Sequence, residues 1–543
     1  MGDHAYDGVI RYHEQTKHHF RRFARSLGYM DWKNQPNPFR SYEGAESVPL
    51  PLLKSDPPGS HLCLYERINN RPQDFSLGNI AAFLELSLGL SAWKAIAGSQ
   101  WSLRINPSSG NLHPTECHLI LPAMAFLGAG VFHYNPFQHA LELRSQVAAT
   151  ICRRIADHFA AEGFLVALSS IFWRESWKYG ERGFRYCNHD IGHALACLSF
   201  SANLQGWKIK YLNTLSDEQT GVLLGFDRVK WTELEEEHPE LLCFVCGNEK
   251  ADVPRHLQGD LITDFSRLSF NGDPNVLSEE RARWDIINEV SALTKKPATP
   301  EQRYQYGKSP WHTGAVSALT AAGLIRRRRS AVSFSGEKSL ERDQFLAILD
   351  RTIPRDHCAP FDVELMEPCV HLLIFVHSVS DLQQGLYFFI RNSNHIEEIQ
   401  HHCRSGFQWK QIEQGLPLYF LKSGNFRQIA ARVSCDQDIA GYGVLSLGMV
   451  ARFRPIVQQE PFRYRHLFWE AGMIGQILYL EAEANGLRAT GIGCFYDDSV
   501  HEIMGLGGNS YQSLYHFTIG DPVEDTRLKT YPPYAHLRDR GVA

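Results

Sequence analysis

The chain has 543 residues, more than one hydrophobic core usually supports, so two domains are expected. With 43% hydrophobic and 21% charged residues it is too apolar for a disordered chain, and a net charge of −5 gives no indication of nucleic-acid binding. The longest apolar runs fall well short of the roughly 20 residues that span a bilayer. The polar N-terminus has no signal-peptide pattern, and the cysteines have no framework spacing, so we expect a cytoplasmic protein without a membrane anchor.

In the first half, segment 104–111 reads Arg-Ile-Asn-Pro-Ser-Ser-Gly-Asn. Small polar residues around a proline and a glycine predict a tight loop, which could hydrogen-bond a flat heterocycle or be an ordinary turn. Apolar residues at helical spacing then predict a long helix from Phe184 to a stop at Gly206. His189, Asp190 and His193 lie on this helix, and we expect them to serve the helix surface or an interface and not a metal.

Turn and linker residues mark a boundary between about 272 and 320, with a helical stretch near 278–293. An apolar helix end at 315–325 precedes four arginines and Ser330. Guanidinium groups bind phosphate bidentately, although such a run can also be a solvated surface or a localisation signal. A second long helix is predicted at 464–486, followed by the glycine-rich segment 490–495 and by the cations Arg527 and Lys529.

The two halves repeat one another. Shifting the segment from Phe184 by 280 places it on the segment from Tyr464 without a gap as far as Gly225 and Gly505. Arg185 then matches Arg465, and Gly192 matches Gly472. Weaker matches at other shifts follow in the same order: 79–87 with 341–349, 114–122 with 368–376, and 243–248 with 516–521. We therefore expect a duplicated α+β domain.

Together these segments resemble the FMN-binding elements of the nitroreductase superfamily, and specifically its SagB/ThcOx-type dehydrogenases. The resemblance implies two tandem domains, each a mixed or antiparallel sheet flanked by helices, that form an intrachain pseudo-dimer. Segments 12–44, 172–186 and 471–487 also look like parts of that subgroup. The implied divisions are an N-terminal segment 1–46, a first domain 47–272, a linker with a helix 273–320, and a second domain 321–543.

The resemblance also assigns residues to the flavin. It implies phosphate binding by an Arg-Arg-Ser motif, contact with the ring and ribityl chain by a Pro-Ser-Ser-x-Asn loop, a glycine-rich strand beside the ring, and terminal cations. In this sequence these are Arg328, Arg329 and Ser330; Pro107, Ser108, Ser109 and Asn111; Gly491, Ile492 and Gly493; and Arg527 and Lys529. No metal is implied.

The repeat indicates which half keeps each motif. The second half has Phe361 to Leu365, bulky and acidic, at the place of the Pro-Ser-Ser-x-Asn loop. The first half has Glu66, Arg67 and Ile68 in place of Arg-Arg-Ser, and Tyr211 to Asn213 in place of the glycine strand. Because the losses are complementary, we predict one composite flavin site per chain and the loss of its symmetry mate.

Lys178 and Tyr179 follow the same logic. They resemble the Lys-Tyr pair proposed for proton transfer in the azoline dehydrogenases of the family, and their shifted counterparts are Gln458 and Gln459. A lysine partly desolvated near a flavin could act as a base, and the tyrosine as an acid or a hydrogen-bond donor. The alternative is a surface lysine beside a packing tyrosine.

Three functions stay open at this point. The first is an FMN-dependent dehydrogenase that exchanges hydride at the flavin N5 with a small molecule or a modified peptide, the latter beside a peptide-modifying enzyme. The second is an NAD(P)H-dependent nitro- or quinone-type reductase. The third is a catalytically silent scaffold that binds a partner. Oligomerisation beyond the pseudo-dimer is not readable from the sequence.

Overall fold

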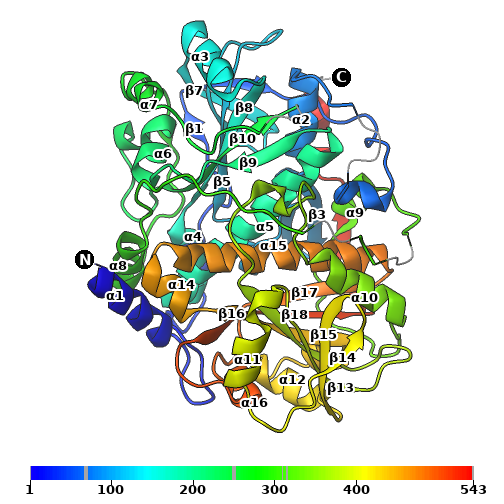
Figure 1. Ribbon diagram of the computed structural model, residues 1–543. Coiled ribbons are helices and arrows are strands. Elements are labelled where there is room, and N and C mark those ends of the chain that lie inside the picture. Colours follow the sequence, from blue (N-terminus) through cyan, green and yellow to red (C-terminus); the bar gives the residue numbers. More distant parts are fainter. Residues whose placement is uncertain (1, 67–70, 248–251, 308–309, 313–315, 541–543) are drawn as a thin grey trace.

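The structure is a computed structural model, and it describes residues 2–66, 71–247, 252–307, 310–312 and 316–540. Each half contains a seven-stranded antiparallel sheet, and Figure 1 shows the two sheets on opposite sides of the long helix α15. In sheet order, the first consists of β2 (Glu46–Pro49), β7 (Ala140–Gln146), β6 (Gly130–Asn135), β5 (Thr115–Leu121), β8 (Gly163–Ser170), β10 (His238–Cys246) and β9 (Lys208–Tyr211). The second consists of β14 (Lys410–Glu413), β15 (Leu416–Ser423), β13 (Gly385–Phe389), β12 (Val370–Val376), β16 (Leu445–Arg452), β18 (Tyr511–Gly520) and β17 (Arg488–Ile492).

The strand orders confirm the duplication. The segments matched in the sequence occupy the same places: β5 corresponds to β12, and β10 to β18. The edge strands β2 and β14 have equivalent places in their sheets but come from different points of the chain. In sequence, β2 precedes the other strands of its sheet, whereas β14 follows β13 and precedes β15. The α+β class with antiparallel sheets flanked by helices is therefore confirmed.

The inner strands are buried along almost their whole length because both faces of each sheet are covered. On one face lie the central helices. On the outer faces, small helices pack over separate apolar clusters: α3 (Ala149–Phe159), α6 (Asp217–Leu224) and α7 (Gly259–Ser266) over the first sheet, and α11 (Ile396–His402), α12 (Arg427–Val433) and α16 (Ser499–Met504) over the second. Among the described residues, no helix is both long and apolar enough to traverse a lipid bilayer.

Two central helices, α5 (Gly183–Leu204) and α15 (Arg463–Ala484), confirm the long helices predicted from the sequence. They cross at Gly192 and Gly472, the pair related by the repeat. A Cβ on Gly192 would lie 2.1 Å from the Trp469 carbonyl oxygen, and one on Gly472 would lie 2.3 Å from the His189 carbonyl oxygen. The two backbones can approach this closely only because both positions are glycine.

Two reciprocal ion pairs flank this crossing. Arg185 of the first half binds Asp497 of the second at 2.7 Å, and Arg465 of the second half binds Asp217 of the first at 2.7 Å. All four residues belong to matched repeat positions. An interface in which equivalent residues exchange partners has twofold character, so the halves form an intrachain pseudo-dimer.

Both ends of the chain pack against the opposite half. Helix α1 (Gly2–Gln15) places His13 against Tyr464 and Gln512. Near the C-terminus, β19 (Lys529–Tyr531) pairs with β3 (Leu90–Ile96), which continues to β4 (Ser99–Arg104). The buried Tyr534 then accepts a hydrogen bond from the Leu90 amide at 2.9 Å. The division of the chain at 46, 272 and 320 stays a sequence-level prediction.

Two helices are shorter or later than expected. The linker helix α8 covers only Asp285–Leu293, because the amides of Leu277 and Ser278 donate to the Glu235 carboxylate and hold the preceding backbone in place. The helix before the arginines, α9, is Ala321–Arg327, with Thr320 as its N-cap. It therefore begins later than the apolar segment and includes the first two arginines.

Candidate functional site

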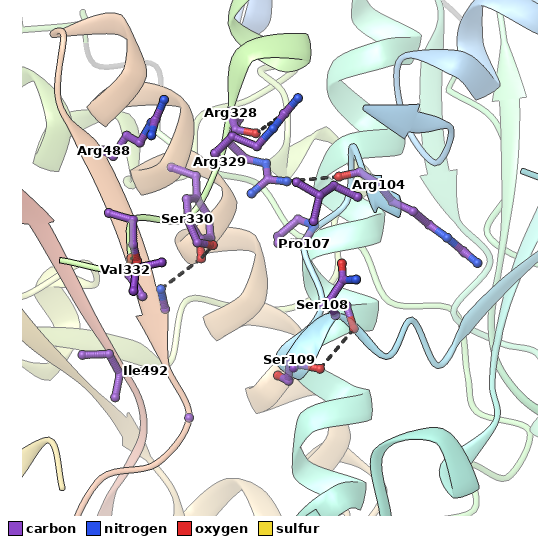
Figure 2. Close-up of a pocket in the computed structure, with 18 of the residues that line it drawn as sticks. Arg104, Pro107, Ser108, Ser109, Arg328, Arg329, Ser330, Val332, Arg488 and Ile492 are labelled. Carbon is purple, nitrogen blue, oxygen red and sulfur yellow. Dashed lines mark hydrogen bonds between the residues drawn. The ribbon is translucent and has the colours of Figure 1, made fainter. Parts of the chain in front are cut away.

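A cavity of about 780 Å³ lies between the halves, within the size range of cofactor pockets. Its walls come from the loop after β4 in the first half, and from the segment after α9 and strand β17 in the second half. Figure 2 shows the arginines at one end, with Ser108 and Ser109 facing Ile492 across the space. Of the residues predicted to bind the flavin, the cavity brings together Pro107, Ser108, Ser109, Asn111, Arg328, Arg329, Ser330, Gly491, Ile492, Gly493 and Arg527.

One end of the cavity is strongly basic. Arg328 is buried, donates from Nη2 to the Arg104 carbonyl at 3.1 Å, and has an Nε without a partner among the described residues. Among the residues that the structure describes, the Arg329 guanidinium is hydrogen-bonded only to carbonyl oxygens, those of Arg326, Arg328 and Ser91. Burial, followed by the neighbouring Arg328, lowers the pKa of Arg329 to about 10. Such a site favours an anion.

The four arginines of the run have different roles. Arg326 is paired with Asp56 and Glu85, and Arg327 is exposed and does not line the cavity. Only the last two arginines reach the cavity, because α9 ends at Arg327 and the chain turns inward. Arg488 joins them from β17 and is paired with Glu483 and Glu524. Arg488 was not predicted from the sequence, where its place at the start of the glycine strand was the available signal.

Gly491 in β17 and Gly493 just after it both pack closely against tyrosines. A Cβ on Gly491 would lie 2.1 Å from Tyr515 Oη, and one on Gly493 would lie 2.4 Å from the Tyr186 ring. The Gly491 amide donates to Tyr479 Oη at 3.0 Å, and Tyr479 also shares a hydrogen bond with Ser330 at 2.8 Å. These three tyrosines form one wall of the cavity, and this wall was not predicted from the sequence.

The loop of the first half is held rigidly from within. Gly110 and Asn111 have left-handed backbone, with φ of 62° and 60°. Asn111 donates from Nδ2 to the Ser102 carbonyl and contacts His113 through Oδ1, so its amide supports the loop. By contrast, the buried Asn106 Oδ1 has no partner among the described residues, although it lines the cavity.

Beneath this loop lies a pair of buried acids, Glu175 and Asp190, that the sequence analysis did not identify as a pair. Ser108 donates to Glu175 at 3.4 Å, and the Ser109 amide donates to Asp190 at 3.2 Å. Burial raises the pKa of Asp190 to about 7. Burial and the neighbouring Asp190 raise the pKa of Glu175 well above its usual value. Asp190 is the one acidic residue within α5, and this was the available signal.

This pair gives a pH-dependent prediction. The pKa of Asp190 is raised to about 7 in the folded chain, against about 3.9 when unfolded, so the folded chain keeps a proton that the unfolded chain loses between these values. The contribution of Asp190 to the free energy of unfolding is therefore largest at low pH. It falls by about 1.4 kcal/mol per pH unit as the pH rises from about 3.9 to about 7. We expect Asp190→Asn to show a smaller fall in the urea midpoint from pH 5 to pH 8. The exposed Asp343→Asn is the control, and equal slopes in wild type and Asp190→Asn would contradict the assignment.

Lys178 and Tyr179 end helix α4 (Phe172–Tyr179) next to the loop. Tyr179 lines the cavity, whereas Lys178 lies behind Gly110, where a Cβ would be 2.7 Å from Tyr179 Oη and 3.3 Å from Lys178 Nζ. Burial raises the pKa of Tyr179 well above its usual value, so it is a neutral hydrogen-bond donor at pH 7.

The two C-terminal cations lie apart from the buried arginines. Arg527 is at the cavity rim, exposed and paired with Asp525 at 2.7 Å. Lys529 is in the exposed strand β19, opposite Ala95, and is not among the residues that line the cavity. The tertiary contacts of β19 with the first half place this lysine outside.

The symmetry-related position is filled. At the place of the Pro-Ser-Ser-x-Asn loop, Asp362 is buried and accepts a hydrogen bond from Ser199 at 2.5 Å. The cavity beside Tyr211 and Asn213 measures only about 10 Å³, room for at most a single water. Linker residues close it: Asn213 donates to the Gln302 carbonyl, and Thr299 donates to the Asn213 carbonyl. Glu66 is described, but its neighbours Arg67 and Ile68 lie outside the described residues.

His189 and His193 lie in the interface of the central helices, whereas Asp190 faces the loop of the first half. His189 stacks on Tyr515, and His193 shares hydrogen bonds with Gln476 and Tyr515, both in the second half. No group of three or more His, Cys, Asp and Glu side chains suited to a metal ion occurs in the part of the chain that the structure describes.

Comparison with known proteins agrees with this architecture. Residues 325–521 match the model of the nitroreductase family. A crystal structure of a protein from Anabaena variabilis described as a nitroreductase is similar over 95% of this chain and 99% of its own, with a TM-score of 0.67 and 20% identity. A nitroreductase-type protein from Ralstonia eutropha matches 42% of this chain at 18% identity and covers 97% of its own, with a TM-score of 0.28. The E. coli microcin synthetase McbBCD complex with truncated pro-MccB17 matches 41% of this chain and 79% of its own at 16% identity and a TM-score of 0.28. No curated protein sequence matches the chain. The second half therefore carries a nitroreductase family domain, and the chain as a whole has the nitroreductase fold.

Proposed function

We propose that the protein is an FMN-dependent oxidoreductase with one composite flavin site per chain. The observation that carries this proposal is the cavity between the halves, which joins a buried basic end from one half to a rigid polar loop from the other, while its symmetry mate is filled by protein. The match of residues 325–521 to the nitroreductase family supports an oxidoreductase.

The cavity walls fit a flavin. Arg328, Arg329 and Ser330 would hold the phosphate, because their donors converge on one end and Arg328 Nε is unpartnered among the described residues. Two other buried polar atoms, Asn106 Oδ1 and Asp190 Oδ2, have no partner in the described part of the chain and lie beside the cavity. They would meet polar edges of the ring system. On the β17 side, the wall beside the ring would consist of Gly491, Gly493 and the tyrosines that pack against them.

Bound FMN would supply the hydride acceptor or donor of the reaction. The chain's own residues would orient the substrate and handle its proton. Tyr179, kept neutral by burial, would donate a hydrogen bond into the cavity from its Oη, and Lys178 would hold or accept a proton behind it. The Glu175–Asp190 pair would keep the loop in place beneath the ring.

For the substrate, we propose dehydrogenation of a small molecule or a modified peptide, as in the azoline oxidases, with the peptide route acting beside a peptide-modifying enzyme. Retention of Lys178 and Tyr179 next to the intact cavity, against two glutamines at the filled site, supports this direction. Reduction of a nitro or quinone acceptor with NADPH is the other outcome of the assays below.

The test of the composite site is the ratio of FMN to chain after reconstitution and heat release. We expect a ratio near one, which should fall in Asn106→Ala from the first half and in Arg329→Ala from the second, because each removes a polar group aimed at the same ligand. Arg327→Ala, an exposed neighbour outside the cavity, is the matched control. A ratio near two would show that the mate site works, and no flavin even with excess FMN would favour the silent scaffold.

Lys178→Met and Tyr179→Phe should leave the FMN ratio unchanged and lower turnover, each by about 10²- to 10⁴-fold, as expected for loss of general acid–base catalysis. The rate would be measured with an azoline-containing peptide and with NADPH as separate probes. Lys54→Met, an exposed lysine of the first half, is the control. Full activity in both site variants would leave the pair with a packing role only.

A further inference from the structure

Two thiols meet where β17 leaves the cavity. Cys494 follows Gly493 and lines the cavity, and Cys435 belongs to the turn after α12. Although 59 positions apart in the chain, the two Sγ atoms lie 2.8 Å apart, so little movement separates them from bonding distance. Both side chains are half-buried, which leaves them within reach of small reagents.

The turn that carries Cys435 is held in an unfavourable shape. Cys435 and Asp436 both have left-handed backbone with φ of 55°, a conformation that residues other than glycine seldom adopt. Gln437 donates from Nε2 to the Cys494 carbonyl at 2.9 Å, and Tyr496 donates from Oη to Asp436 at 2.9 Å. These bonds fix the turn against segment 494–496 and keep the two thiols together.

The surroundings distinguish the two thiols. The hydrogen bond with Cys435 is the main cause that lowers the pKa of Cys494 to about 5. His18 and Arg182 also lower this pKa. The same hydrogen bond and burial raise the pKa of Cys435. Cys494 is therefore the thiolate of the pair and the better nucleophile at neutral pH.

We propose that Cys435 and Cys494 form a reversible dithiol–disulfide pair in the wall of the cavity, which exchanges with small disulfides. The Cys494 thiolate attacks one sulfur of a disulfide RSSR, forms a mixed disulfide and releases RS⁻. Cys435 then gives up its proton and attacks Cys494 Sγ, which releases the second RS⁻. In total, two cysteine thiols and one RSSR give one protein disulfide and two RSH, so the two electrons pass to the small disulfide.

The experiment uses the full chain, with FMN and after its removal, in buffers of varied ratios of reduced to oxidised glutathione. After thiols are blocked and the protein is digested, we expect mass spectrometry to find a peptide cross-link between Cys435 and Cys494, reversed by dithiothreitol. The cross-link should form with and without FMN, so failure of the proposed flavin function would leave this result unaffected. In Cys435→Ser, which lacks the resolving thiol, we expect Cys494 to retain a glutathione adduct.

Alkylation rates supply an independent measurement. At pH 6, iodoacetamide should modify Cys494 about tenfold faster than Cys152, a half-buried cysteine with a raised pKa. Cys494 has the larger fraction of thiolate at this pH, and this difference outweighs the lower intrinsic nucleophilicity of a thiolate with a low pKa. Cys152→Ser is the matched control and should leave the cross-link intact. Absence of the cross-link at every glutathione ratio, or equal alkylation of Cys494 and Cys152, would overturn the proposal.

Discussion

Arg329→Ala is expected to weaken FMN binding by about 30- to 1000-fold. The guanidinium is half-buried, has a pKa lowered by burial and by Arg328, and within the described part of the chain is hydrogen-bonded only to carbonyl oxygens. It would thus form a charge-assisted pair with the FMN phosphate in a desolvated site. Removal of one partner of such a pair costs about 2–4 kcal/mol, which corresponds to this loss of affinity at about 1.4 kcal/mol per tenfold change. The measurement is a fluorescence titration of flavin-free protein with FMN.

One variant and one ligand give this titration its controls. Arg327→Ala changes the preceding arginine, which is exposed and outside the cavity, and should alter the affinity by no more than about twofold. Riboflavin, which lacks the phosphate, should bind wild type and Arg329→Ala with similar affinity. If riboflavin binding fell as much as FMN binding in Arg329→Ala, the arginine would have a structural role and the phosphate would lie elsewhere.

Asp497→Asn is expected to destabilise the protein by about 3–5 kcal/mol. The Asp497 carboxylate is buried between Arg182 and Arg185, with contacts of 3.0 and 2.7 Å that join the two halves. Asparagine has nearly the same shape but no charge, so two buried guanidinium groups would lose their counterion. The measurement is the urea unfolding midpoint, read by two probes because a chain with two fused domains need not unfold in one step.

The pseudo-twofold arrangement gives this prediction a built-in comparison. Asp217→Asn breaks the reciprocal pair with Arg465, but Arg465 keeps Glu240 as a second partner at 2.9 Å, so we expect a smaller loss of stability. Asp498→Asn, next to Asp497 but partly exposed, should cost about 1 kcal/mol or less. A midpoint for Asp497→Asn equal to that of Asp498→Asn would show that the buried pair does not hold the halves together.

The same pair determines a response to acid. The Arg182 and Arg185 charges hold the pKa of Asp497 well below its usual value, although burial alone would raise it. Its stabilisation is therefore fully present above the unfolded value of about 3.9 and is lost as pH falls toward the folded value. Wild type should lose stability over this acidic window, and Asp497→Asn should lose less.

Much of the architecture could be predicted from the sequence because it depends on local patterns. Helical spacing and a terminal glycine define α5 and α15, and the shift of 280 between them identified Arg185, Gly192, Asp217 and their partners as matched positions. The shift could not show what those matches do. That Gly192 and Gly472 touch, and that each arginine binds the aspartate of the other half, follows from how the helices cross.

The sequence by itself determined the duplicated α+β fold, the two long helices and the candidate loop, arginine and glycine motifs, because periodicity, turn residues and internal repetition are properties of neighbouring positions. Tertiary structure alone decided which arginines reach the cavity, why Gly491 and Gly493 face tyrosines, how linker residues close the mate position, and which thiols and acids become neighbours. These features depend on contacts between residues far apart in the chain. Burial and the approach of charges, which set the pKa of Asp190 and Cys494, exist only once the two halves have packed together.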